Sequence, residues 1–120
     1  MSYAGPERRR HPRIKANFIV SYRVLEGRDD IDTSQAKDFS AGGVYITTNR
    51  PFGKGVRLAL RIRLPFGPEP VEVAGTAVDS REIVKDLIYD TRVEFSRLKD
   101  EQRKVIEQTV SYYLKKKEKS

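Results

Sequence analysis

The segment that decides the fold is Val56-Arg57-Leu58-Ala59-Leu60-Arg61-Ile62-Arg63-Leu64. A large aliphatic residue stands at every second position, and arginine stands at three of the four positions between them. Because successive side chains of a strand point to opposite faces of its sheet, this alternation predicts a β-strand with one buried face and one basic, solvated face. Sheets with one face in water are commonly antiparallel. The segment therefore predicts a mainly β, antiparallel fold.

Five other segments carry a strand pattern, at residues 17–25, 34–39, 44–48, 71–78 and 87–95. Gly75 is expected to weaken or bend the fourth of these. In the last one, the side chains expected to face inward are Tyr89, Val93 and Phe95. Charged, proline-containing or glycine-containing turns separate the segments. Six short strands with turn signals about every eight to twelve residues predict a small antiparallel barrel or sandwich.

The pattern changes after residue 99. From Asp100 to Lys117 apolar residues recur at helical spacing, at Val105, Ile106, Thr109, Val110, Tyr113 and Leu114. Acidic residues at the start and lysines at the end match the dipole of a helix. We therefore expect one amphipathic helix packed on the strands. The chain is expected to divide into an arm (residues 1–15), a barrel (16–98) and a C-terminal helix with a basic tail (99–120).

Composition excludes several classes of protein. A chain of 120 residues is expected to form one domain with a modest core. It has no cysteine and a single histidine, His11, which excludes disulfides and structural zinc. No apolar run of about 18 residues predicts a membrane span, and no apolar stretch follows the N-terminal charges as in a secretory signal. These features predict a cytoplasmic protein without a metal or cofactor.

The net charge of +7 lies at the two ends of the sequence. Residues 1–15 hold five basic residues and one acid, and residues 115–120 hold four lysines and one acid. Residues 16–114 hold fifteen of each sign. A domain that binds duplex nucleic acid usually has a basic face on its folded body. The distribution therefore disfavours general nucleic-acid binding.

The sequence lacks the usual signs of an enzyme. The only histidine is flanked by arginine, so it is a poor general base. Asp38 and Ser40 have no histidine on a strand to complete a hydrolytic triad, and no glycine-rich nucleotide motif of the phosphate-loop or dinucleotide-binding type is present. We predict a protein without catalytic residues.

The arginine cluster Arg8-Arg9-Arg10-His11-Pro12-Arg13 precedes the first strand. A terminal run of charge is often only a solvated tail. Arginine, however, binds phosphate with a planar fork and reads the O6 and N7 edge of guanine. The all-lysine C-terminal run lacks both abilities and is expected to be the solvated end of the helix. The cluster is therefore a candidate site for an anion that carries nucleobases.

A second motif, Asp38-Phe39-Ser40-Ala41-Gly42-Gly43, begins at the end of the strand predicted at 34–39 and leads to the strand predicted at 44–48. Asp, Ser and Gly are common in β-turns, so the motif alone is also consistent with an ordinary turn. In a binding site, Asp38 would accept a base N–H, Ser40 would donate to a phosphate or base, and Gly43 would allow close approach to the backbone. The row Arg57, Arg61 and Arg63 is better explained as a solvated strand face, balanced by Glu72 or Glu94 on neighbouring strands.

Together, in this order and about 25 residues apart, the two motifs resemble those of the PilZ family of bacterial cyclic di-GMP receptors. That family has Arg-x-x-x-Arg in an N-terminal arm and Asp/Asn-x-Ser-x-x-Gly at a strand turn. The resemblance spans nearly the whole chain and implies a six-stranded antiparallel β-barrel followed by a C-terminal helix. It also implies a receptor whose arm becomes ordered on binding and which signals to a separate partner protein.

The resemblance assigns roles to individual residues. Arg9 and Arg13 would bind the phosphates and the guanine edge of the ligand. Asp38 and Ser40 would hold a guanine and a nearby phosphate, and Gly43 would allow the turn. Further candidates from the same two motifs are Arg10 and Gly42. Arg8 stands just before the first motif arginine, where a basic residue in the family often accompanies two intercalated ligand molecules.

One position departs from some relatives, which place an aromatic residue on a later strand beside the ligand. Residues 76–79 supply no aromatic side chain there. Two other functions stay open from the sequence. One is a small barrel that binds single-stranded nucleic acid, although its strands show no mixed aromatic and basic face. The other is a protein adaptor of the same fold that binds no ligand.

Overall fold

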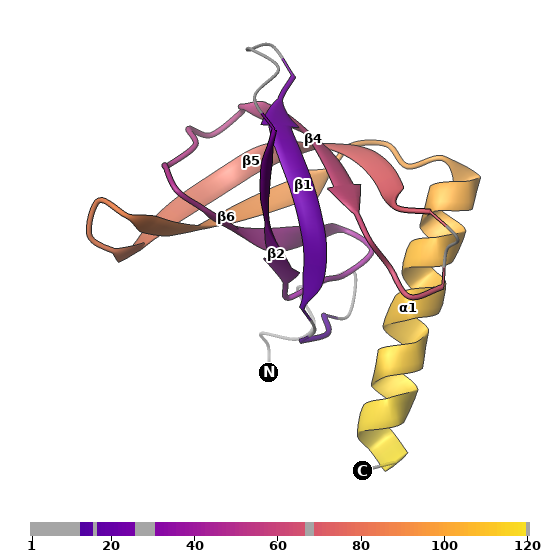
Figure 1. Cartoon of the computed structure of the whole chain (residues 1–120). Helices are drawn as coiled ribbons and strands as arrows, with labels where there is room; N and C mark the ends of the chain where they lie inside the picture. The colour runs from indigo at the N-terminus through magenta and orange to yellow at the C-terminus, as the bar shows by residue number, and fades with distance from the viewer. Residues whose placement is uncertain (1–12, 16, 26–30, 67–68, 120) are drawn as a thin grey trace, which may run out of the picture.

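The computed structural model describes residues 13–15, 17–25, 31–66 and 69–119 (Figure 1). Its elements follow one another as β1 (Phe18–Val24), β2 (Asp32–Lys37), β3 (Gly43–Thr48), β4 (Arg57–Ile62), β5 (Val71–Val84), β6 (Ile88–Phe95) and α1 (Asp100–Lys119). The strands form a closed barrel in the order β1-β2-β3-β6-β5-β4, and every pair is antiparallel. The predicted six-stranded barrel with a C-terminal helix is thus confirmed, and the sandwich is excluded.

Strand β4 has the two faces that its alternation predicts. Leu58, Leu60 and Ile62 are buried in the barrel, whereas Arg57 and Arg61 are exposed. The strand pairs with β1 on one side and with β5 on the other. It therefore closes the barrel between the first and fifth strands of the chain.

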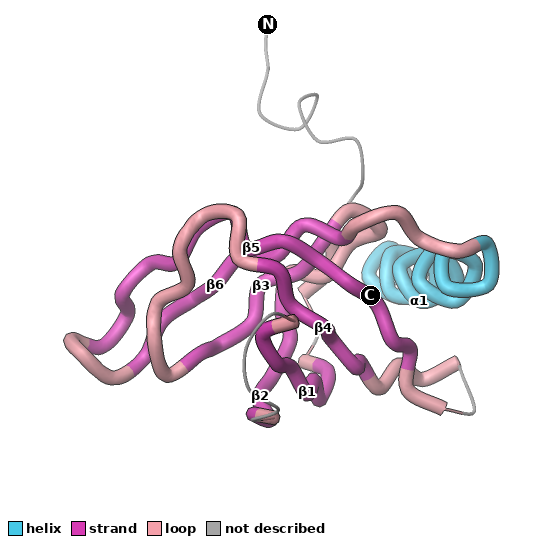
Figure 2. Tube along the Cα trace, turned by 90° about the horizontal axis from the view of Figure 1, so that it is seen from above, coloured by secondary structure: helices cyan, strands magenta, loops and turns pink. Residues whose placement is uncertain are grey.

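Strand β5 is longer than the sequence predicts. Instead of ending at Val78 it continues to Val84 and forms with β6 a hairpin that projects from the barrel, as Figure 2 shows. The prediction stopped early because residues 79–82 are polar at consecutive positions. The pairing of β5 with β6 shifts register between Ala77 and Asp79. A second shift lies between Glu82 and Val84.

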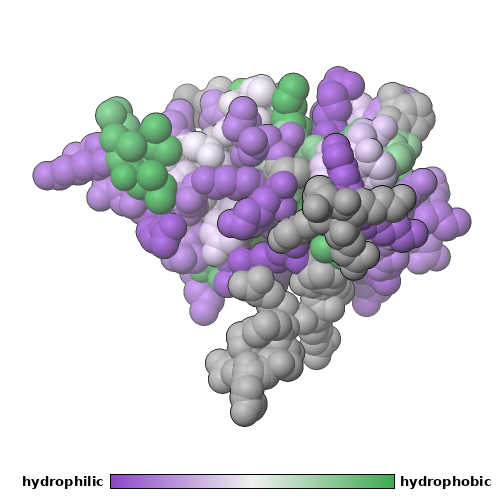
Figure 3. Space-filling view, turned by 90° about the horizontal axis from the view of Figure 1, so that it is seen from below, coloured by the Kyte–Doolittle hydropathy of each residue, from purple (hydrophilic) through white to green (hydrophobic). Residues whose placement is uncertain are grey.

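The outer end of this hairpin carries apolar side chains in water. They gather in the patch at the left of Figure 3, formed by Ile83, Val84, Leu87 and Ile88. Further down β6, Thr91 and Val93 are buried, while Tyr89 and Phe95 are only partly buried. The expected inward positions of Val93 and of Phe95, which packs against the core, are therefore confirmed. Tyr89 does not belong to the core, and on this face the buried residue nearest to it is Thr91. The hydroxyl of Thr91 bonds to those of Thr48 (2.9 Å) and Ser80 (2.5 Å).

Helix α1 lies beside the barrel and contributes to the same core (Figure 1). Ile106, Thr109 and Val110 are buried on its inner face, as the helical spacing predicts. The Phe18 ring contacts the rings of Phe39 and Tyr113 edge to face, at centroid distances of 5.3 and 5.9 Å. Within the described part of the chain, no helix is both long and apolar enough to cross a membrane.

Candidate ligand-binding site

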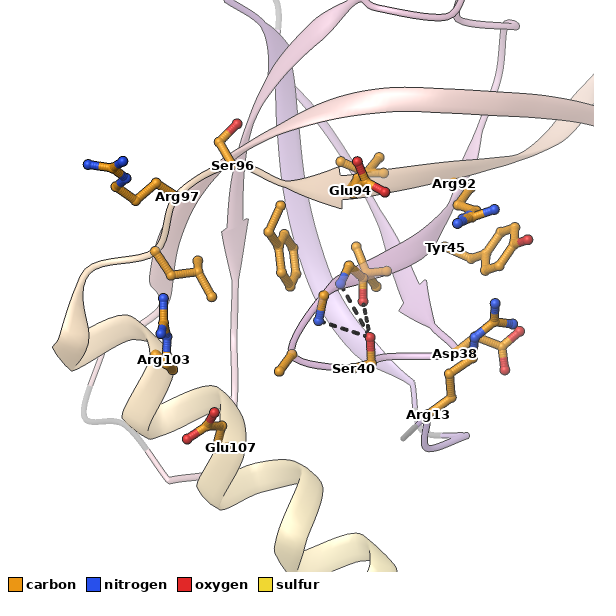
Figure 4. Close-up of a pocket in the computed structure, with 17 residues that line it drawn as sticks. Arg13, Asp38, Ser40, Tyr45, Arg92, Glu94, Ser96, Arg97, Arg103 and Glu107 are labelled. Carbon is orange, nitrogen blue, oxygen red and sulfur yellow. Dashed lines mark hydrogen bonds between the residues drawn. The ribbon is translucent and has the colours of Figure 1, made fainter. Parts of the chain in front are cut away.

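A cavity of about 670 Å³ lies where the Asp38–Gly43 turn, the end of β6 and the beginning of α1 meet (Figure 4). Its walls come from four separate parts of the sequence: the end of the arm, the turn with the start of β3, the end of β6 with the residues after it, and α1. The residues that line it are Arg13, Asp38, Ser40, Ala41, Gly42, Gly43, Val44, Tyr45, Arg92, Val93, Glu94, Phe95, Ser96, Arg97, Leu98, Arg103 and Glu107. The lining combines small residues, charged residues and two aromatic rings, those of Tyr45 and Phe95.

A short antiparallel bridge attaches the end of the arm to the turn. Ile14 and Phe39 exchange both backbone hydrogen bonds, at 2.8 and 2.9 Å. Both side chains are buried in the core, so burial holds the bridge in place. Because side chains alternate along the backbone, the neighbours Arg13 and Asp38 remain outside the core and both line the cavity. The two sequence motifs therefore meet at this bridge.

Ser40 fixes the shape of the turn. Its Oγ accepts hydrogen bonds from the backbone N–H groups of Gly42 (3.1 Å) and Gly43 (3.3 Å), drawn as dashed lines in Figure 4. The backbone N–H of Ser40 donates to the carbonyl of Gly43 at 3.0 Å. Such side-chain to backbone bonds are the reason that serine favours turns. Here the Ser40 hydroxyl holds the turn together instead of pointing freely into the cavity.

Gly43 is needed where β3 passes β6. A Cβ atom at this position would lie 2.3 Å from the carbonyl oxygen of Val93, closer than real contacts allow. The sequence predicts that Gly43 lets another group come close to its backbone. In the structure, the group that lies close to Gly43 is the backbone of β6 at Val93. Gly75 has the same role on the other side of β6, where a Cβ would lie 2.5 Å from Val93 Cγ1. Strand β6 is thus held tightly between β3 and β5 beside the cavity.

The charged groups at the arm end of the cavity are only loosely paired. The Lys15 ammonium lies 3.7 Å from the Asp38 carboxylate, and the Lys15 side chain is 91% exposed. Asp38 itself adopts a left-handed backbone conformation with φ of 48°, which Asp tolerates better than most residues. The Arg13 guanidinium lies over the Tyr45 ring, 5.8 Å from its centroid. A cation therefore lies over an aromatic face at this end of the cavity.

The structure brings together all the predicted site residues that it describes. These five are Arg13, Asp38, Ser40, Gly42 and Gly43. The predicted residues Arg8, Arg9 and Arg10 lie outside the described residues. The expected balance of the β4 arginine row is confirmed at Arg61, which binds Glu72 on β5 at 2.6 Å. In the described ranges, no three side chains of the metal-binding types come together.

Several cavity residues were not predicted from the sequence. Tyr45 supplies the aromatic face that residues 76–79 lack, and Arg92 stands opposite it in the register of β3 and β6. Arg97, Arg103 and Glu107 reach the cavity from the end of β6 and from α1. No local motif marks these positions, because they depend on strand pairing and helix docking. The one sequence signal concerns Tyr45. It stands between Val44 and Ile46, which share the opposite face of the strand, so its side chain is expected to face away from the core.

Comparison with known proteins places this geometry in a family. The sequence matches the PilZ domain over residues 7–112. Among proteins with curated functions no significant match was found. The fold is similar to that of the inhibitor of motility MotI/DgrA from Bacillus subtilis, with a TM-score of 0.71 and 20% identity over 90% of this chain and 52% of that chain.

Two further solved structures share the fold. The PilZ domain of YcgR from Escherichia coli, determined with c-di-GMP, has a TM-score of 0.66 and 16% identity over 93% of this chain and 95% of that one. The MrkH–c-di-GMP complex from K. pneumonia has a TM-score of 0.68 and 20% identity over 93% of this chain and 55% of that one. The chain thus spans about half the length of MotI/DgrA and MrkH.

The family match covers most of the sequence, and the barrel, the turn and the helix agree with it. PilZ domains are a known c-di-GMP-binding fold, and they are generally receptors without catalytic activity. The chain belongs to the PilZ domain family.

Proposed function

We propose that this protein is a non-catalytic receptor for cyclic di-GMP and that the ligand binds in the cavity between the turn and α1. The observation that carries the proposal is the Ile14–Phe39 bridge, which places Arg13 of one motif beside Asp38 of the other. Cyclic di-GMP presents two phosphates and two guanines. Arginine binds phosphate and the guanine edge, and a carboxylate accepts the N–H donors of guanine.

In this proposal the arm completes the site. Arg8, Arg9 and Arg10 precede Arg13 by three to five residues in the sequence, and in this proposal they also bind the ligand. Binding would hold this segment against the turn, and the gain from several charge-assisted hydrogen bonds would offset a loss of backbone entropy of about 1–2 kcal/mol per residue fixed. The held segment is then a surface that a separate partner protein reads. We place this signalling in the bacterial cytoplasm.

The Tyr45 ring supports a ligand with flat bases. It lines the cavity next to the Arg13 guanidinium. A guanine inserted between them would stack on the ring and the guanidinium plane, and base stacking on an aromatic side chain contributes about 1–3 kcal/mol. A bare phosphate or a peptide carboxylate would gain nothing from this ring. The proposed ligand is therefore a nucleotide, and Arg8 favours two intercalated molecules per chain.

Titration calorimetry with cyclic di-GMP tests the proposal. The Arg9→Ala/Arg13→Ala double variant should lose affinity by roughly 100-fold or more, because hydrogen bonds to charged groups contribute about 1.5–3 kcal/mol each. The Arg61→Ala/Arg63→Ala variant removes the same charge from β4 and from the residue just after it, both exposed and outside the cavity. It should bind within about threefold of the unmodified protein, since exposed charges act only through a screened field.

Two outcomes contradict the proposal in different ways. If the unmodified protein does not bind cyclic di-GMP, the function is wrong. If it binds and the Arg9→Ala/Arg13→Ala variant binds equally well, the site assignment is wrong. A parallel titration with a short single-stranded oligonucleotide identifies the alternative. That binding would fall steeply with salt and would be weakened alike by both double variants.

A further inference from the structure

The wall of the cavity that faces the turn belongs to α1 and takes no part in either sequence motif. Arg103 and Glu107 line it from the first half of the helix, and Arg97 lies at the rim. Figure 4 shows Arg103 and Glu107 on the part of the helix that borders the cavity, across from the turn that carries Ser40. Residues four apart in a helix lie on the same face, one turn from each other.

These two side chains are not paired with each other or with the rest of the described protein. No ion pair or side-chain hydrogen bond within the described residues involves Arg103 or Glu107. An arginine and a glutamate at this spacing commonly form a salt bridge on an isolated helix. Here both are exposed and both line the cavity. Their hydrogen-bonding groups are available to a ligand.

The helix wall repeats the chemistry of the arm end of the cavity. At the arm end the ligand meets Arg13 and the carboxylate of Asp38, and at the helix end it meets Arg103 and the carboxylate of Glu107. Ala41, Phe95 and Leu98 contribute apolar surface to the same cavity. The cavity therefore offers two sets of one guanidinium and one carboxylate, together with an apolar surface on which flat rings can lie.

This combination suits guanine better than a bare anion. Guanine presents the acceptors O6 and N7 to an arginine and donates from its exocyclic amino group, which a carboxylate accepts. A free phosphate would be attracted by Arg103 but repelled by Glu107. An adenine would offer an amino group in place of O6 and so would lose the acceptor that arginine binds. Arg103 and Glu107 together would therefore favour guanine over other bases, and would not simply bind any anion.

We propose that Arg103 and Glu107 form a second guanine-binding subsite, on the opposite wall of the cavity from Arg13 and Asp38. The inference rests on the proposed function, because the guanine belongs to cyclic di-GMP. It is either the second base of one ligand molecule or a base of a second, intercalated molecule. In both cases the ligand joins the turn to α1. Helix α1 then becomes part of the binding site and not only a cover of the core.

Calorimetry on two helix variants tests this subsite. Arg103→Ala and Glu107→Gln should each weaken cyclic di-GMP binding by roughly tenfold, the effect of losing one good base contact. Matched controls are Lys104→Ala and Glu101→Gln, which make the same changes of charge on exposed helix positions that do not line the cavity. Both controls should bind as the unmodified protein does. Because all four side chains are exposed, thermal unfolding should be nearly unchanged in every variant.

The stoichiometry identifies the source of the guanine. If the subsite holds the second base of one molecule, the variants keep the stoichiometry and lose affinity. If it holds a base of a second molecule, the variants bind one molecule fewer per chain. The unmodified protein should bind cyclic di-AMP more weakly than cyclic di-GMP. In the Glu107→Gln variant the difference in affinity between the two ligands should be smaller.

Failure of this inference is distinct from failure of the proposed function. If the unmodified protein binds and both helix variants match their controls in affinity and stoichiometry, the subsite is wrong while the function stands. If the unmodified protein does not bind cyclic di-GMP, the function is overturned, and the subsite is overturned with it.

Discussion

The outer face of β4 and the wall of the cavity both carry arginine, yet they use it differently. On β4, Arg61 donates from Nε (3.1 Å) and from a terminal nitrogen (2.6 Å) to the carboxylate of Glu72, its cross-strand partner. In the cavity, Arg13 and Arg103 have no carboxylate partner among the described residues. The difference teaches that the number of cations does not locate a site. A cation without a carboxylate partner, in the wall of a cavity, is the better candidate for binding a ligand.

The backbone differs in the same way between the two regions. Strand β4 pairs regularly on both sides along its length. The cavity wall contains a left-handed Asp38, a serine-fixed turn and a glycine pressed against β6. Such irregular backbone costs free energy and persists only where the surroundings hold it. The comparison therefore predicts that substitutions in the cavity wall cost more than equivalent substitutions elsewhere.

The largest effect on stability is expected at Gly43. Replacing it with alanine puts a methyl group against the Val93 carbonyl, so the free energy of unfolding should fall by about 1–3 kcal/mol or more. Gly53→Ala is the matched control, because nothing lies within 4 Å of its added Cβ. That variant should be neutral or more stable by up to about 1 kcal/mol. Urea denaturation measures the free energy of unfolding of both variants. Equal losses in the two variants would contradict the prediction that Gly43 is the more restricted position.

A smaller loss is expected for Ser40→Ala. It removes the acceptor of two backbone N–H groups in a nearly buried turn, which should lower the free energy of unfolding by about 1–2 kcal/mol. Ser96→Ala serves for comparison, because Ser96 lines the same cavity but no side-chain hydrogen bond is found for it within the described part of the chain. Its effect should stay within about 0.5 kcal/mol. A Ser96 effect as large as that of Ser40 would show that the turn is not held by its serine.

The smallest effect is expected on the β4 face. A double-mutant cycle of Arg61→Ala and Glu72→Ala should give a coupling energy of about 0.2–1 kcal/mol, since both side chains are well exposed. The coupling should shrink at high salt. Cyclic di-GMP binding should be unchanged in all members of the cycle. A clear loss of binding in Arg61→Ala would remove the distinction between the two arginine groups.

Much of the fold follows from local pattern. The alternation in β4 and the helical spacing of Ile106 and Val110 depend only on which residues meet the core. The extension of β5 could not be predicted in this way. Residues 79–84 project beyond the barrel, so no core selects their pattern. Their pairing depends on β6, which follows directly in the chain.

The residues of the cavity also fall into two groups, those that a local sequence pattern indicates and those that depend on long-range contacts. Arg13, Asp38 and Ser40 stand in compact motifs, so residue type and order were enough to single out these three residues, which line the cavity. Tyr45 and Arg92 become neighbours only through the pairing of β3 with β6. Arg103 and Glu107 enter through the docking of α1. A single sequence carries no direct signal of such long-range pairing, and the opposite wall of the cavity therefore needed the structure.

The projecting hairpin has a consequence for self-association. β5 pairs with β4 only as far as Thr76, so on that side the peptide groups of residues 81–84 have no strand partner in the described part of the chain. A free edge beside exposed Ile83 and Leu87 is a template for a strand of another molecule. The register shifts in this ribbon and the charges of Arg81 and Glu82 oppose such stacking. The polar residues of this ribbon, which do not line the cavity, therefore disfavour strand pairing between molecules.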